Sequence, residues 1–120
     1  MICFDTNIII YIANGTLGES IVKNEPIVYA SVSRIEALGY HDIRSIEEQR
    51  VRELLGTLTE VPFTDAVTEL AIRLRQQKKM SLGDAIVAAT ALERGSELWT
   101  ANDADFAHIE GLRLYNPLKS

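Results

Sequence analysis

The chain has 120 residues, of which 47% are apolar, and its formal net charge is −5. This length fits a single domain, residues 1–120, built around one hydrophobic core. No apolar run reaches the roughly 18 residues that a membrane span needs, and we expect neither a membrane segment nor a secretion signal. The single cysteine, Cys3, excludes an internal disulfide and favours a reducing cytoplasm. The acidic balance excludes a protein that holds nucleic acid through a general excess of lysine and arginine.

Short apolar runs alternate with longer amphipathic stretches along the chain. The short runs predict strands over residues 2–4, 27–30, 60–63, 97–100 and 112–115. Apolar residues at helical spacing predict helices over residues 8–13, 31–40, 43–58, 65–78 and 83–93, with shorter turns over 18–22 and 103–109. Strands that alternate with helices are typical of an α/β fold with a mostly parallel sheet.

Local signals predict where three of these helices begin or end. Ser33, with Glu36 three residues later, has the spacing of a capping box and predicts a helix start. Thr64 precedes the fourth predicted helix and is expected to cap it. Gly95 is expected to end the fifth, because glycine readily takes the left-handed conformation that closes a helix.

Four acids lie near the predicted carboxyl ends of strands. Asp5 directly follows the first strand, and Asp103 comes three residues after Thr100 at the end of a later one. Glu36 lies on the helix after the second strand, and Asp84 lies near the start of the fifth helix. Ligands of parallel sheets bind beyond these strand ends, so we expect the four acids at one edge. Neighbouring carboxylates raise one another's pKa or bind a cation, and oxygen ligands suit Mg²⁺ or Mn²⁺.

Each acid also has a purely structural interpretation. Asp5 would cap the helix that follows it, and Glu36 would be the capping partner of Ser33. Asp84 would interact favourably with a helix dipole, and Asp103 would be a turn residue. Only their joint placement favours a metal site, at which a divalent ion activates water and stabilises charge on a phosphoryl oxygen.

Four segments carry these acids in a distinctive setting: Phe4–Ile8, Ser33–Tyr40, Leu82–Leu92 and Leu98–Phe106. In this order they resemble the motifs of the PIN-domain nucleases, and among these the VapC-type toxins of prokaryotic toxin–antitoxin pairs. The resemblance covers nearly the whole chain. It implies a three-layer α/β/α sandwich around a parallel sheet and cleavage of RNA that depends on Mg²⁺ or Mn²⁺.

The resemblance also implies roles for individual residues. Asp5 and Asp84 would be the main metal ligands, and Glu36 would complete the site directly or through water. The family often has its fourth acid at the position of Asn102, so we expect the neighbouring Asp103 to take that role. Asn102 itself and Asp105 are the other candidates for this position. Supporting hydrogen bonds would come from Thr6, Asn7, Thr100 and Asn102.

Partners follow from the same resemblance: an RNA substrate, a cognate antitoxin protein and a second copy of the chain in a homodimer. The apolar face of residues 43–58 is a candidate dimer surface or part of the core. Two groups of basic residues are candidate RNA contacts or ordinary solvated helix faces: Arg73, Arg75, Lys78 and Lys79, and Arg44, Arg50 and Arg52. His41 and His108 have no partner at metal-ligand spacing and are expected to be surface or structural residues.

Two other acid-rich folds fit the sequence less well. A phosphatase of the haloacid dehalogenase type also has an aspartate after its first strand, but it needs a second one where this chain has Asn7. A receiver-like domain needs paired early acids and a late lysine, a set that the sequence does not show. The alternative that stays open is a catalytically inactive PIN-like module that only binds RNA or a partner.

Overall fold

The computed structural model describes residues 1–18 and 25–119, so the turn predicted over residues 18–22 falls almost wholly outside it. The described residues form one sheet of five strands: β1 (Ile2–Phe4), β2 (Ile27–Ala30), β3 (Thr59–Val61), β4 (Glu97–Trp99) and β5 (Leu114–Tyr115). The strand order is β3-β2-β1-β4-β5, and each neighbouring pair is parallel. The prediction of an α/β fold with a parallel sheet is therefore confirmed.

Five helices connect the strands in the described part of the chain: α1 (Thr6–Ala13), α2 (Ser31–Leu38), α3 (Ser45–Leu55), α4 (Asp65–Gln77) and α5 (Leu82–Arg94). A short 3₁₀ turn, Asp103–Asp105, follows β4. Each predicted helix is present, and its ends differ from the prediction by up to three residues. Within residues 1–18 and 25–119, no helix has the length and apolar character that crossing a membrane requires.

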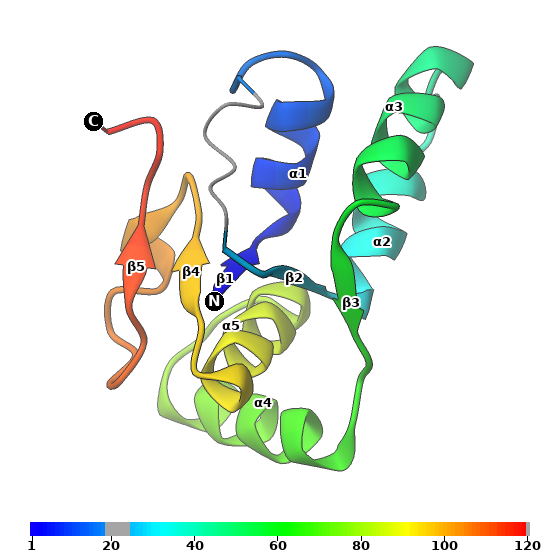
Figure 1. Ribbon diagram of the computed structural model, residues 1–120. Coiled ribbons are helices and arrows are strands. Elements are labelled where there is room, and N and C mark those ends of the chain that lie inside the picture. Colours follow the sequence, from blue (N-terminus) through cyan, green and yellow to red (C-terminus); the bar gives the residue numbers. More distant parts are fainter. Residues whose placement is uncertain (19–24, 120) are drawn as a thin grey trace.

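The helices form two layers, one on each face of the sheet (Figure 1). Cys3 of β1 packs in the cluster of buried side chains that includes α4 and α5. Its neighbours Ile2 and Phe4 point to the other face, where they pack in a second cluster with α1 and α3. This alternation follows from the two-residue period of a strand. The three-layer α/β/α sandwich is confirmed.

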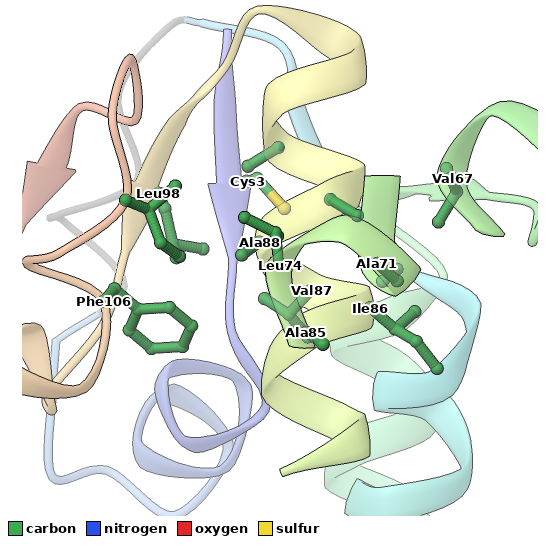
Figure 2. Close-up of a cluster of buried hydrophobic side chains, with 14 of the residues drawn as sticks. Cys3, Val67, Ala71, Leu74, Ala85, Ile86, Val87, Ala88, Leu98 and Phe106 are labelled. Carbon is green, nitrogen blue, oxygen red and sulfur yellow. The ribbon is translucent and has the colours of Figure 1, made fainter. Parts of the chain in front are cut away.

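Small side chains on α5 let this helix lie close to the sheet. Ala85, Ala88 and Ala89 are fully buried, and Figure 2 shows Ala88 next to Cys3. Burial raises the pKa of the Cys3 thiol to about 12, so Cys3 is an inert core residue rather than a reactive one. The position of α5 matters for function because its first turn carries Asp84.

Two of the three predicted helix ends are confirmed. Thr64 caps α4 by accepting a hydrogen bond from the Val67 amide at 3.3 Å, and Gly95 closes α5 with φ at 62°. The capping box at Ser33 is wrong. Strand β2 runs directly into α2, whose N-cap is Ala30, so Ser33 lies inside the helix. Ser33 is fully buried and its hydroxyl contacts Thr6, which frees Glu36 from a capping role.

The sheet has its topological switch point beside β1. From β1 the chain passes to β2 on one side, and it later returns to β4 on the other side. In α/β sheets this change of direction opens a crevice at the carboxyl ends of the two strands. Asp5 follows β1 here, and its amide donates a hydrogen bond to the Trp99 carbonyl of β4 at 3.0 Å.

Candidate active site

A cavity of about 460 Å³ lies at this crevice. It is lined by residues from α1, α2, α5 and the loop after β4: Asp5, Thr6, Asn7, Ile10, Glu36, Tyr40, Asp84, Val87 and Asn102. Three of the four predicted acids are therefore together. A hollow of about 510 Å³ on α3 is lined by residues of that helix alone, so it gathers no groups from distant segments.

Asp5 both caps a helix and faces the cavity. Its Oδ1 accepts a hydrogen bond from the Ile8 amide at 3.0 Å, which satisfies the first turn of α1. Burial raises the pKa of Asp5, and the negative charge of Asp84 adds to the rise. Hydrogen bonds from the Thr100 side chain and the Ile8 amide oppose this shift without cancelling it. The structural and functional interpretations of Asp5 are thus compatible.

Glu36 is held in place by two hydroxyl groups. The Thr6 hydroxyl donates to Glu36 Oε1 at 2.6 Å, and Thr6 Oγ1 lies 3.0 Å from the buried Ser33 Oγ. A hydroxyl has one hydrogen to donate, so Ser33 donates to Thr6 while Thr6 donates to Glu36. This chain of hydrogen bonds fixes the direction of an otherwise exposed glutamate.

Gly83 is a site residue that the sequence analysis did not identify. A Cβ atom built on Gly83 would lie 2.5 Å from Glu36 Oε2, so a larger residue there would displace the carboxylate. The missing side chain lets Glu36 approach the first turn of α5, one residue before Asp84. A glycine inside a helix costs about 1 kcal/mol of stability relative to alanine. A glycine at the start of a predicted helix is therefore the sequence signal that could have identified Gly83.

Asp84 is half-buried at the start of α5, where its amide donates to Ser81 Oγ at 3.1 Å. Burial raises the pKa of Asp84, and the negative charges of Asp105 and Glu36 raise it further. Hydrogen bonding of the Ser81 side chain to the Asp84 carboxyl group lowers this pKa and so acts in the opposite direction. Two carboxylates with raised pKa values therefore share one cavity, an arrangement that a bound cation would stabilise.

Asn102, at the chain position where the family often has its fourth acid, lines the wall of the cavity. The backbone amide of Asn102 donates a hydrogen bond to Thr100 Oγ1 at 3.0 Å, which fixes the loop directly after β4. Asp105 does not line this cavity, although its charge acts on Asp84 and both residues line a neighbouring cavity.

Asp103, the residue expected to be the fourth acid, does not line the cavity. Lys119 Nζ lies 3.2 Å from its Oδ2, and Asn116 Nδ2 donates to its Oδ1 at 3.3 Å. These two partners hold the pKa of Asp103 below its usual range, and Lys119 has the larger effect. The structure therefore does not bring Asp103 together with Asp5, because its carboxylate is engaged by the C-terminal segment.

The donor set of the cavity consists of oxygen and amide groups, which suits Mg²⁺ or Mn²⁺. Among the described residues, no three carboxylate, imidazole or thiol groups lie close enough to enclose a metal ion directly. Mg²⁺ commonly keeps several waters and binds through one or two carboxylates. Asp5 and Asp84 line the same cavity, and the charge of Asp84 raises the pKa of Asp5, so this pair fits a hydrated ion.

Comparison with known proteins connects this geometry to a family. A family model described as PIN domain matches residues 2–112. No curated protein matches the chain. One similar solved structure is VapBC2 from Rickettsia felis, bound to a DNA fragment from its promoter. A chain of that structure aligns with a TM-score of 0.83 and is 23% identical in sequence. The alignment covers 97% of this chain and 98% of that one.

Two further structures are similar over nearly their whole length. A chain of a toxin–antitoxin complex from Klebsiella pneumoniae is 30% identical, with a TM-score of 0.74 and coverage of 98% of both chains. A chain of DNA-bound VapBC from Salmonella typhimurium is 18% identical, with a TM-score of 0.77 and coverage of 96% of both chains. The first of these carries sequence as well as fold similarity.

Proposed function

Because the chain belongs to the PIN domain family, we propose that it is a metal-dependent endoribonuclease. The observation that carries the proposal is that Asp5, Glu36 and Asp84 reach one cavity from three separate segments. The cavity lies at the switch point of a parallel sheet, where α/β enzymes bind their substrates. These three acids are the proposed catalytic set.

Asp5 and Asp84 are the proposed ligands of Mg²⁺ or Mn²⁺, and Glu36 completes the site directly or through water. Such an ion, when bound, supplies positive charge for a phosphoryl oxygen and makes water a better nucleophile. Glu36 is the most exposed of the three acids, and Thr6 holds it in place. We therefore assign Glu36 as the general base that takes a proton from the attacking water.

Neighbouring side chains orient these acids rather than react. Thr6 directs Glu36, and Thr100 hydrogen-bonds the carboxylate of Asp5. Thr100 also accepts from the amide of Asn102. Asn7 and Asn102 line the cavity and are proposed to contact substrate or water. Asp103 is outside the proposed catalytic set while Lys119 engages it.

Replacement of Asp5 by asparagine tests the proposal. Asparagine caps helices as well as aspartate does, so Asp5→Asn removes the charge while keeping α1 capped. We expect metal-dependent cleavage of a structured RNA by the wild type and a loss of about 10²–10³-fold or more in kcat for the variant. Asp42→Asn is the matched control, because Asp42 is exposed and its positive φ of 67° suits asparagine.

Two outcomes would reject the proposed mechanism. Equal cleavage in EDTA would exclude the metal mechanism, and equal activity of wild type and Asp5→Asn would exclude the site. Absence of cleavage together with absence of metal binding in calorimetry would favour the second candidate function, a PIN-like module that binds RNA or a partner. The presence of Asn102 in the place of the family's acid favours this alternative.

We propose an antitoxin as the protein partner, since the similar chain from Klebsiella pneumoniae, which is 30% identical, is part of a toxin–antitoxin complex. Ile35, directly before Glu36, is 71% exposed, and Tyr40 at the cavity is 39% exposed. A partner segment that covers them would also cover the acids. Co-purification with the product of a neighbouring small reading frame tests this, and Ile35→Asp should abolish it.

A homodimer and a cytoplasmic location complete the proposal. The candidate dimer face over residues 43–58 is mostly in the core, because Val51 and Leu55 are buried, while Ile46 is 46% exposed. A dimer that uses α3 must therefore rely on Ile46 and its polar neighbours. Sedimentation of the wild type and Ile46→Asp distinguishes a dimer through this face from a dimer through another.

A further inference from the structure

A second cavity adjoins the proposed active site. Its volume is about 250 Å³, and it shares Asp84 with the larger cavity. It is lined by Lys78, Lys79, Met80, Ser81, Asp84, Ala104 and Asp105. A ligand bound at Asp84 can therefore extend from the acidic cavity into one that is lined by two lysines.

Hydrogen bonds on both sides fix the segment that carries these lysines. The Lys78 amide donates to the Leu74 carbonyl at 3.3 Å, at the end of α4. The Arg75 side chain donates from Nε to the Met80 carbonyl at 3.3 Å, directly after the lysines. The lysine backbone is therefore held on a short connection between two packed helices, although the side chains themselves are exposed.

The charges of Lys78 and Lys79 are available to a ligand. Over residues 1–18 and 25–119, the ion pairs of lysine and arginine involve Arg34, Arg44, Arg52, Arg94 and Lys119. Neither Lys78 nor Lys79 takes part in one. On α3, in contrast, Glu47 and Glu48 already neutralise two of the arginines. Of the residues in the two basic groups, Lys78 and Lys79 line a cavity together with the proposed site residue Asp84.

A polyanionic substrate needs such a site here. The chain has a net charge of −5. The second cavity is lined by Asp84 and Asp105, whose carboxylates repel phosphate. Lys78 and Lys79 place two positive charges against these two negative ones. Lysine binds phosphate as a point charge without reading bases, so contacts of this kind position a strand without selecting its sequence.

We propose that Lys78 and Lys79 bind the backbone phosphates of the RNA strand next to the phosphate that is cleaved, one phosphate for each lysine. This inference rests on the proposed ribonuclease function for the identity of the ligand. The lysines bind and align the strand but do not take part in the bond cleavage.

Salt-dependent binding tests the proposal. Fluorescence anisotropy of a labelled single-stranded oligoribonucleotide is measured in EDTA, which prevents hydrolysis, for wild type and Lys78→Gln/Lys79→Gln. Each phosphate contact on a single strand contributes about 0.7 to the slope of log K against log salt. From about 50 to 200 mM salt, the wild type should lose about sevenfold more affinity than the double variant.

Arg73→Gln is the matched control. Arg73 lies on α4, the helix that precedes the two lysines, and it is exposed, but it lines a different cavity, with His108 and Glu110. It should keep the slope of the wild type. The same slope in the double variant, the same loss in Arg73→Gln, or no binding of RNA by the wild type would each overturn the lysine site.

Cleavage by the same proteins in Mg²⁺ separates this inference from the proposed function. Cleavage by the wild type with an unchanged salt slope in the double variant rejects the lysine site alone. A lysine-dependent slope without cleavage by the wild type rejects the ribonuclease and leaves RNA binding. If both proposals hold, the double variant should raise KM and leave kcat unchanged.

Discussion

Gly83→Ala separates stability from activity at the proposed active site. The added Cβ would lie 2.5 Å from Glu36 Oε2, and ordinary contact begins at 3.4 Å, so the carboxylate must move by about 0.9 Å. The group that moves is the free end of a flexible side chain, so the backbone need not shift. Alanine is also the better helix former, by up to about 1 kcal/mol.

We therefore expect the free energy of unfolding to stay the same or rise by up to about 1 kcal/mol, which is about 4 °C in Tm. A displacement of about 1 Å in a catalytic group lowers activity by about 10²-fold, so kcat should fall by about that factor. Circular dichroism during heating measures the first quantity, and cleavage of a labelled RNA in Mg²⁺ measures the second.

Gly56→Ala is the matched control for this experiment. Gly56 follows α3 in helical conformation, and a Cβ there meets its nearest atom, the Glu53 carbonyl oxygen, at 3.4 Å. It should keep both stability and activity. Full activity in Gly83→Ala would show that the position of Glu36 is not needed. A lower Tm would show that the added Cβ displaces the backbone of α5 and not the side chain of Glu36.

Three further predictions concern the acids. Because folding raises the pKa of Asp5 and Asp84, these two groups contribute stability to the metal-free protein that is lost as pH rises above about 4, so urea unfolding should show a more favourable change with rising pH for Asp5→Asn than for the wild type. Mg²⁺ or Mn²⁺ at 100 times Kd should add about 2.7 kcal/mol to the free energy of unfolding, and Asp84→Asn should abolish this gain in thermal shift assays. Asp103→Asn should cleave RNA as the wild type does, because its carboxylate lies outside the cavity.

Each of these has a result that would contradict it. Greater stability at neutral than at acidic pH, present in the wild type and absent in Asp5→Asn, would reverse the sign inferred for burial. A metal-induced rise in Tm that survives in Asp84→Asn would move the ion elsewhere. A large loss of cleavage in Asp103→Asn would mean that Asp103 leaves Lys119 and joins the other acids during the reaction.

The sequence by itself determined the elements and the first three acids. Residue periodicity within a few positions decides whether a segment forms a strand or a helix, and the predictions at Thr64 and Gly95 depended on equally local rules. Asp5, Glu36 and Asp84 could be grouped because a parallel α/β sheet brings the carboxyl ends of its strands to one edge. This step needed only the order of the elements and the motifs of the family.

The tertiary structure decided which side chains meet at that edge. Local spacing predicts Ser33 at a helix end, but its partner is Thr6, 27 residues away. Position in the chain predicts Asp103 as the fourth acid, but Lys119 holds its carboxylate, and Asn102 lines the cavity instead. Gly83 matters only because Glu36 of another helix lies against it. Such contacts depend on packing between distant segments, and no local rule of sequence contains them.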